Sequence, residues 1–341
     1  MDFKIHRASV LTAKTKKTAT IAHRRLGCVL ILLIMLSLLS GCGKKQLTPE
    51  EAVKQTVQYQ LKTVPRPESA SIGGEWTLLS VLRSGEEVPD SYQEIYLTNL
   101  KKRLKETDGV LSEEKYTEYA RAALAAAALG EDAGNIDGYD LLTPLTDLEQ
   151  VTQQGINGAA FALLALDTAK NQNRVLETAK AELRDWLLEQ ELPAGGFALE
   201  REENAQADID VTAMAVQALA PYQEEEQTAD VIERAVIVLA EAQKADGTYE
   251  SWGETSCETV AQVWIALSAL EIDGQEDSRF VKADKGLFDI LMTFSDGKGG
   301  FSHLRDGEND AMATDQALCA LDAYHRYRSG DRAFYDMSDS R

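Results

Sequence analysis

The sequence predicts an all-α fold, an (α/α)6 toroid of six helical hairpins with an Ala-rich inner ring and an amphipathic outer ring. Three observations support this prediction. Similar segments recur with a period of about fifty residues, each repeat holds two stretches of helical periodicity, and these stretches alternate between Ala-rich and charged types. Because each such repeat buries its core only against its neighbours, the repeats are expected to build one architecture.

The repeat is clearest in the second half of the chain. A helix-like stretch ends in a glycine-containing turn and an aromatic residue, and the aromatics Phe197, Tyr249 and Phe301 follow one another at intervals of 52 residues. Each aromatic precedes a polar loop and a helix of small residues, over 212–219, 259–267 and 314–321. A more degenerate copy runs from Gly155 to Leu166. The period therefore extends over at least four repeats.

Helical periodicity predicts twelve helices, which pair into six hairpins. Their expected ranges are 50–61, 75–84, 90–106, 115–129, 139–150, 156–169, 174–190, 208–220, 228–243, 256–270, 280–294 and 311–328. Small residues allow backbones to approach closely, so the Ala-rich helices are expected inside and the charged, one-sided helices outside. An open solenoid is the alternative, but it needs polar caps at both ends, and neither end of the sequence offers an obvious one.

The first 41 residues have the pattern of a secretory signal. Seven Lys and Arg residues precede an apolar run from Leu26 to Leu39. These fourteen residues are too few for a helix that crosses the hydrocarbon core, which is about 30 Å thick. The ending Leu39-Ser40-Gly41-Cys42 resembles the lipobox of bacterial lipoproteins, which implies cleavage before Cys42 and its lipidation. An ordinary secretory leader and an uncleaved anchor are the alternatives.

The expected organisation follows from these patterns. It comprises a signal peptide over 1–41, a short tether over 42–49, the toroid over 50–330 and a tail over 331–341. We expect the protein to be lipid-anchored at the extracytoplasmic face of the cell membrane, with the acylated Cys42 in the lipid bilayer. The net charge of −21 argues against nucleic acid as a partner. The helical registers of Cys257 and Cys319 differ in height by ~12 Å, so both are expected to be free thiols.

The repeats resemble those of the terpenoid cyclase and protein prenyltransferase toroid superfamily, in which glycines precede the aromatic residue, as they do between Gln190 and Phe197. A closer resemblance is to bacterial surface proteins with prenyltransferase/squalene-oxidase repeats, and it covers roughly residues 50–339. It is carried by Asn157-Gly158 and by the segments 208–214, 312–316 and 334–339. The α-domains of the cobalamin carriers transcobalamin and intrinsic factor are related, but a cobalamin-carrier-like binder would need a separate β domain.

The resemblance raises two activities. Protein prenyltransferases bind zinc, but the cysteines and histidines here are scattered at Cys257, Cys319, His303 and His325, so neither a metal nor another cofactor is expected. Class II terpene cyclases use an Asp-x-Asp-Asp-Thr-Ala motif, whose middle acid protonates an alkene or epoxide. The segment from Asp208 to Ala213 keeps this motif except for Val211, so the resemblance makes Asp210 a candidate general acid.

The aromatic content of 7% is low for a cavity that must stabilise carbocations, and acids in the first turn of a helix also serve as caps. The inner helices of such a toroid are parallel, so their N-termini gather at one mouth. The ligand-binding candidates near this mouth are Asn157, Asp208, Asp210, Trp252, Glu258, Gln262, Asp315 and Gln316. Because these acids offset the positive helix ends, a polyol, sugar, amine or cation is expected there.

The same residues could be only N-caps and interhelical hydrogen bonds. The sequence therefore leads to three hypotheses. We predict a non-catalytic toroid that binds an unknown small ligand or a protein partner. A terpene-cyclase-like enzyme with Asp210 as general acid and a cobalamin-carrier-like binder are the alternatives.

Overall fold

The computed structural model describes residues 47–340 except 172, 201–204 and 252. The predicted signal peptide, Cys42 and most of the tether therefore lie outside the described residues. From Pro49 onward the chain forms one compact unit. Within the described part of this unit there are twelve α-helices and four short 3-10 helices, and β structure is limited to isolated bridges.

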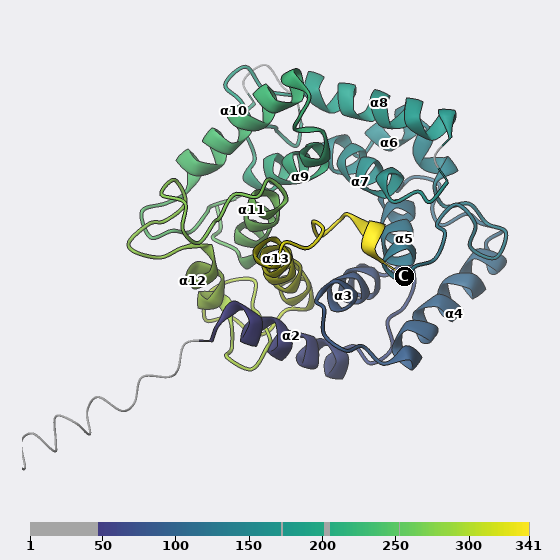
Figure 1. The fold of residues 1–341 in the computed structure, drawn as a ribbon, viewed down its shortest axis with the longest axis horizontal. Coiled ribbons are helices and arrows are strands. Elements are labelled where there is room, and N and C mark those ends of the chain that lie inside the picture. The colour runs from purple at the N-terminus through teal and green to yellow at the C-terminus, as the bar shows by residue number, and fades with distance from the viewer. Residues whose placement is uncertain (1–46, 172, 201–204, 252, 341) are drawn as a thin grey trace, which may run out of the picture. The chain divides into compact units, whose positions relative to one another are not determined.

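Six α-helices form a closed inner ring. Each contacts the next in chain order, and the last contacts the first, so the ring closes and an open solenoid is excluded (Figure 1). The inner helices are α3 (Ile72–Arg83), α5 (Thr117–Ala128), α7 (Gly155–Asp167), α9 (Ile209–Leu219), α11 (Cys257–Ala269) and α13 (Ala311–Ser329).

The other six α-helices alternate with these along the chain and pack against their outer side. They are α2 (Pro49–Thr63), α4 (Asp90–Glu106), α6 (Leu148–Thr152), α8 (Arg174–Glu189), α10 (Glu226–Ala242) and α12 (Leu287–Leu291). The predicted all-α toroid of six hairpins is confirmed. Among the described residues, no helix combines the length and apolar character needed to cross a membrane.

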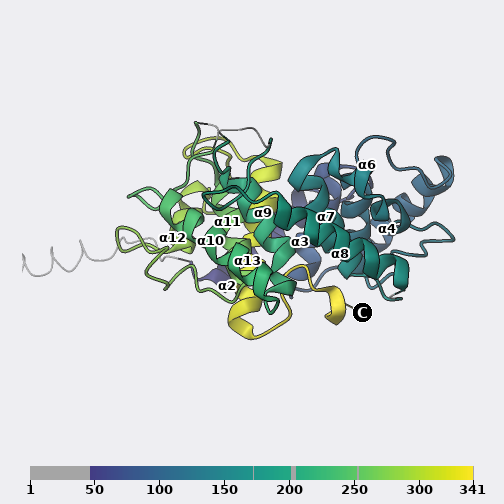
Figure 2. The ribbon, with the colours of Figure 1, turned by 90° about the horizontal axis from the view of Figure 1, so that it is seen from above.

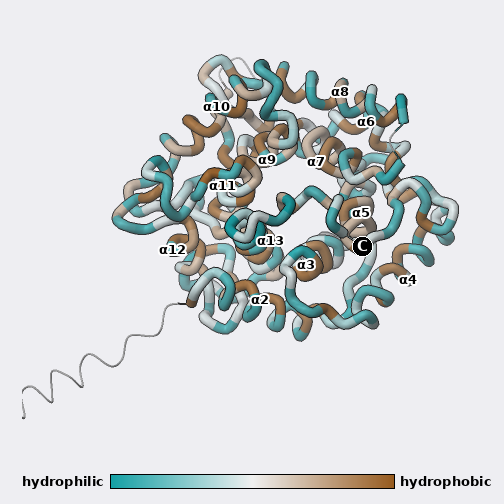
Figure 3. Tube along the Cα trace, viewed as in Figure 1, coloured by the Kyte–Doolittle hydropathy of each residue, from teal (hydrophilic) through white to brown (hydrophobic). Residues whose placement is uncertain are grey.

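Composition explains which helix lies in which ring. The inner helix α7 is buried on nearly all sides, and its alanines, Ala159, Ala160 and Ala162 among them, leave room for the backbones of both neighbours. The outer helix α8 instead buries Leu176, Ala179, Leu183 and Leu187, a spacing that places them on one face, while its other face is hydrophilic (Figure 3). The predicted Ala-rich inner ring and amphipathic outer ring are therefore present.

The repeated aromatic residues anchor the loops that lead into the inner helices. The backbone N–H of Phe197 donates to Thr212 Oγ1 at 3.0 Å, and the N–H of Phe301 donates to Thr314 Oγ1 at the same distance. Each threonine hydroxyl lies 3.2 Å from the carbonyl oxygen of the same aromatic. This tie fixes the start of α9 and of α13, and it gives two of the three repeated aromatics a structural role.

Two of the predicted helices are wrong over part of their length. Over 139–150 the chain forms a 3-10 turn, η1 (Thr143–Thr146), before α6 begins, because Pro144 lacks an N–H and the Asp140 carboxylate accepts from the backbone of Leu142 and Thr143. Over 280–294 helix α12 begins only at Leu287, after a turn in which Asp284 has a positive φ of 61°. Two further 3-10 helices are η2 (Ala220–Tyr222) and η3 (Met292–Phe294).

The C-terminal segment 331–340, which contains η4 (Met337–Asp339), crosses the end of the ring at which the inner helices terminate (Figure 2). The buried Arg83 holds this segment: its guanidinium donates to the carbonyl oxygens of Ala333, Phe334 and Asp336 at 2.9–3.0 Å. Arg83 also pairs with the carboxylate of Asp339 at 2.5 Å. The end of the chain is therefore part of the toroid's packing.

The two cysteines of the described residues, Cys257 and Cys319, are buried and free. This confirms the expectation of two unpaired thiols that was based on helix register.

Candidate functional site

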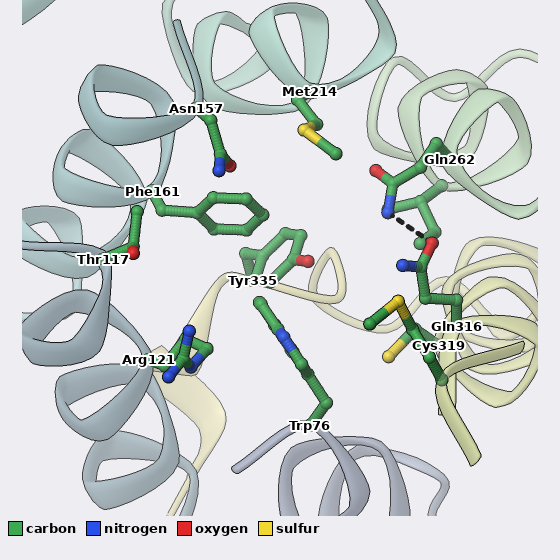
Figure 4. A pocket seen from close by; sticks show the side chains of 12 residues that line it. Trp76, Thr117, Arg121, Asn157, Phe161, Met214, Gln262, Gln316, Cys319 and Tyr335 are labelled. Atoms are coloured by element: carbon green, nitrogen blue, oxygen red, sulfur yellow. Dashed lines mark hydrogen bonds between the residues drawn. The ribbon is translucent and has the colours of Figure 1, made fainter. Parts of the chain in front are cut away.

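A cavity of about 190 Å³ lies on the axis of the inner ring, toward the end at which the inner helices begin (Figure 4). Every inner helix contributes to it, and the C-terminal segment adds one residue. The lining residues are Trp76, Thr117, Arg121, Asn157, Phe161, Met214, Gln262, Ile265, Met312, Gln316, Cys319 and Tyr335. No single hairpin could form this cavity, because it depends on closure of the whole ring.

One wall of the cavity is aromatic. The rings of Trp76 and Phe161 lie 5.3 Å apart between centroids, and those of Phe161 and Tyr335 lie 6.4 Å apart. Tyr335 reaches the cavity from the C-terminal segment and belongs as well to the lining of a second cavity beyond it. The side chain of Tyr335 therefore separates the two cavities.

A chain of amides links three inner helices, and two of its members, Gln262 and Gln316, line the cavity. Gln217 of α9 donates from Nε2 to Oε1 of Gln262 at 2.8 Å and to its carbonyl oxygen at 3.0 Å. Gln262 of α11 donates in turn to Oε1 of Gln316 on α13 at 2.9 Å (Figure 4). These bonds orient the polar ends of Gln262 and Gln316 within the cavity wall.

Arg121 is the one cationic residue among those that line the cavity, and no carboxylate lines it. Its Nε lies 3.7 Å from Oε2 of Glu75, beyond hydrogen-bond distance, and this Nε has no hydrogen-bond partner among the described residues. Burial raises the pKa of Glu75 to about 7, although the charge of Arg121 and hydrogen bonds from Ala70, Tyr96 and Ser71 lower it. The lining therefore carries one positive charge, which forms an ion pair with Glu75. The polyol, sugar, amine or cation expected at the mouth stays a prediction.

The predicted ligand-binding candidates divide between two places. Asn157, Gln262 and Gln316 line the cavity. Asp208 is the N-cap of α9 and accepts from the N–H of Val211 at 2.9 Å, and Oε2 of Glu258 lies 2.8 Å from His303 Nδ1. The candidate Trp252 lies outside the described residues.

Asp315 points away from the cavity, into the contact between α13, α2 and α3. Its Oδ1 accepts from Gln60 Nε2 at 2.5 Å and from Thr77 Oγ1 at 2.6 Å, whereas its buried Oδ2 has no hydrogen-bond partner among the described residues. Burial raises the pKa of Asp315 to about 8 against the opposing hydrogen bond from Thr77. Asp315 therefore connects α13 to the inner helix α3, with which it closes the ring, and to the outer helix α2.

Asp210, the candidate general acid, lies at the mouth rather than in the cavity lining. It precedes the lining residue Met214 by four positions and so lies one helical turn nearer the mouth. Burial raises the pKa of Asp210 to about 6, and hydrogen bonds to Thr259 and Ser251 oppose this rise. A carboxylic acid of this kind holds a proton at mildly acidic pH, which is compatible with general acid chemistry but also with a buried first-turn acid.

Nine of the twelve cavity residues were not candidates from the sequence, and four of these, Trp76, Arg121, Phe161 and Tyr335, supply its aromatic and cationic groups. Phe161 could have been found, because it follows Asn157 by one turn of the same helix. The other three come from the first two inner helices and from the tail, where the aromatic repeat motif is absent. Among the described residues, no group of three or more His, Cys, Asp or Glu side chains could hold a metal ion.

The comparisons with known proteins agree with this fold. Residues 140–335, more than half of the chain, match the prenyltransferase alpha-alpha toroid domain family, and the protein belongs to that family. This confirms the predicted membership of the terpenoid cyclase and prenyltransferase toroid superfamily. Drimenyl diphosphate synthase from Streptomyces showdoensis is 31% identical over 190 residues, which cover 54% of this chain and 34% of that enzyme. The chain thus matches about a third of this relative.

Two solved structures share the architecture. A polysaccharide lyase aligns over 82% of this chain and 97% of its own, with a TM-score of 0.56 and 11% identity. The unsaturated glucuronyl hydrolase of Bacillus sp. GL1 aligns over 84% of this chain and 97% of its own, with a TM-score of 0.52 and 13% identity. At such identities the two structures show that the fold is shared, and no more.

The buried carboxyl of Asp315 yields a prediction about pH. In the unfolded chain an aspartate ionises near pH 3.9, whereas in the folded protein Asp315 keeps its proton up to a pH of about 8. Between these values the unfolded state loses the proton first, so the contribution of Asp315 to stability falls as the pH rises. The variant Asp315→Asn keeps the acceptor for Gln60 and Thr77 and has no carboxyl to ionise. Between pH 5 and pH 8 we expect its free energy of unfolding to rise by at least ~1 kcal/mol relative to that of wild type.

Urea unfolding at several pH values measures this difference, and the exposed variant Asp185→Asn serves as the control. Parallel stability curves for wild type and Asp315→Asn would show that Asp315 is ionised in the folded protein.

Proposed function

We propose that this protein is a non-catalytic binding domain, held by a lipid anchor on Cys42 at the extracytoplasmic face of the cell membrane. In this proposal the axial cavity binds a small molecule that has an apolar body and an anionic group. The observation that carries the proposal is the position of Arg121, whose guanidinium lines a cavity that contains no carboxylate.

The lining matches two parts of such a ligand. The apolar body would contact the wall formed by Trp76, Phe161 and Met214, and the anionic group would accept from Arg121. The amides of Gln262 and Gln316 would add polar contacts opposite the arginine. The ligand must be small, because about 190 Å³ lies below the roughly 300–1,000 Å³ of sites for drug-sized molecules.

The membrane location is supported by the leader and by its lipobox-like ending at Cys42. The fold is compatible with it, since helix α2 begins only seven residues after Cys42. Such a tether would keep the toroid near the bilayer without inserting it.

Substitution of Arg121 tests the cavity. We expect benzoate or hexanoate to raise the melting temperature of the wild-type protein and to bind Arg121→Met at least ~10-fold more weakly, because the charge-assisted hydrogen bonds are lost. Arg121→Lys should keep part of the affinity, and Arg184→Met, on the outer face of α8, should bind as wild type does. Calorimetric titration measures these affinities. Equal binding by wild type and a folded Arg121→Met protein would refute the proposed role of Arg121.

Substitution of the anchoring cysteine tests the location. Cys42→Ser should abolish metabolic labelling with a fatty acid, and the protein should either persist as uncleaved precursor or leave the membrane fraction. Mass spectrometry of the mature N-terminus checks the modification directly. A mature wild-type protein without acyl mass on Cys42 would disprove the lipoprotein assignment.

A terpene-cyclase-like activity is the second candidate function. Two observations favour it: the raised pKa of Asp210, and the match to a drimenyl diphosphate synthase over part of the chain. Three observations weigh against it. Val211 replaces an acid of the motif, Asp210 does not line the cavity, and the cavity is small for a folded prenyl chain.

Asp210→Asn separates the two functions. If the toroid only binds, incubation with prenyl diphosphates should give no cyclised product, and Asp210→Asn should leave benzoate binding unchanged. If Asp210 is a general acid, the wild type should form a cyclised product and the variant should lose at least ~100-fold in turnover. Product analysis by gas chromatography after dephosphorylation distinguishes these outcomes, and a cyclised product that depends on Asp210 would replace the binding proposal.

A further inference from the structure

A second cavity, of about 380 Å³, lies at the opposite end of the ring, where the inner helices terminate. Tyr335 and Ile265 line both cavities and so mark the partition between them. The wall of the second cavity comes from the last turns of α7, α9 and α11, from η2 and the loop after it, and from residues 333–336 of the C-terminal segment. Its volume falls within the usual range for small-molecule sites.

The charge of this second cavity is opposite to that of the first. Three acids line it, namely Asp167, the last residue of α7, Glu224, just beyond η2, and Asp336 of the C-terminal segment, and no lysine or arginine does. The C-terminal ends of the inner helices add the partial negative charge of their last carbonyl groups. A ligand in this cavity would therefore meet a negative potential.

Two buried acceptors in the lining have no donor. Gln217 is 1% exposed, its Nε2 donates to Gln262, and its Oε1 has no hydrogen-bond partner among the described residues. Oδ2 of Asp167 is also buried without a hydrogen-bond partner. A buried acceptor is normally satisfied, so two of them in the wall of one cavity indicate a ligand that donates hydrogen bonds.

The neighbours of Asp167 hydrogen-bond only one of its two carboxylate oxygens and balance only part of its negative charge. Its Oδ1 accepts from the hydroxyl of Tyr222 at 2.8 Å and lies 3.5 Å from Lys180 Nζ. Lys180 lies closer to Glu177, at 2.7 Å, so one lysine serves two carboxylates. The unpartnered Oδ2 is the acceptor that remains for a ligand.

The cavity also has an apolar side suited to an organic cation. Phe334 and Tyr335 contribute aromatic rings, which attract cations over their faces, and Ile265 and Ala220 add aliphatic surface. An inorganic cation would leave this surface unused, and a neutral polyol would leave the acids unused.

We propose that this second cavity binds a small organic ammonium ion. Its N–H groups donate to Gln217 Oε1 and Asp167 Oδ2, Asp167 and Glu224 balance its charge, and its hydrocarbon part packs against Phe334 and Ile265. The site shares Ile265 and Tyr335 with the first cavity, but Arg121 and the anion proposed to bind it take no part in it.

Titration of the full mature protein with 1,4-diaminobutane tests this assignment, and 1,4-butanediol is the uncharged probe of the same length. We expect the diamine to bind and the diol not to bind. Asp167→Asn keeps the acceptor for Tyr222 but removes the charge, and it should weaken diamine binding at least ~10-fold. Glu224→Gln should weaken it less, because this residue is exposed.

Two control variants complete the experiment. Asp185→Asn removes an exposed acid of α8 and should bind the diamine as wild type does. Arg234→Met removes an exposed cation that lines neither cavity, and it should also bind the diamine normally. The proposal is overturned if the diamine does not bind, if the diol binds equally well, or if neither Asp167→Asn nor Glu224→Gln weakens binding.

Discussion

The contact between the first and last inner helices is the constraint on which the rest of the structure depends. Helix α13 packs against both α2 and α3, and Asp315 accepts hydrogen bonds from Gln60 and Thr77 across this junction. Without this closure the inner helices would leave an apolar surface open to water, and the axial cavity would lose part of its wall. The small side chains of the inner ring make closure possible, because they let six helices approach one axis.

Ring closure also determines how charge is distributed in the molecule. Parallel inner helices place all their N-termini at one mouth and all their C-termini at the other. At the first mouth, Asp208 and Asp310 cap helices, so these acids serve the backbone and leave the cavity to Arg121. At the second mouth the last carbonyls reinforce Asp167 and Glu224. One chain thus presents two axial spaces of opposite polarity, separated by a tyrosine.

The sequence predicted the architecture well because the architecture rests on periodic features. The period between Phe197, Tyr249 and Phe301 and the alternation of Ala-rich and charged helices are visible in the sequence, and both correspond to real elements. Where a local signal competed with the period the prediction failed, as at Pro144 and before Gly286. At these two positions the residues of the turn, and not the helical period, set the backbone conformation.

The cavity was less predictable for a physical reason. Rim residues could be placed from the repeat, but the direction of each side chain depends on contacts between helices far apart in the chain. Asp315 shares a helix with Gln316, one residue away, yet it points outward to Gln60 while Gln316 lines the cavity. Tyr335 lies beyond the last helix, where no periodicity applies, and only the bonds of Arg83 to the C-terminal segment bring it to the axis.

The hold of Arg83 on the C-terminal segment has a consequence for how the chain reaches its native state. The partners of this arginine lie about 250 residues further along the sequence, so they emerge from the ribosome long after it does. Contacts of such long range carry a large loop-closure cost and form late. The first hairpin must therefore wait, with an incomplete core, for nearly the whole chain to arrive. During this interval the incomplete core would expose apolar surface to which chaperones can bind. A variant truncated before Phe334 would keep that surface exposed.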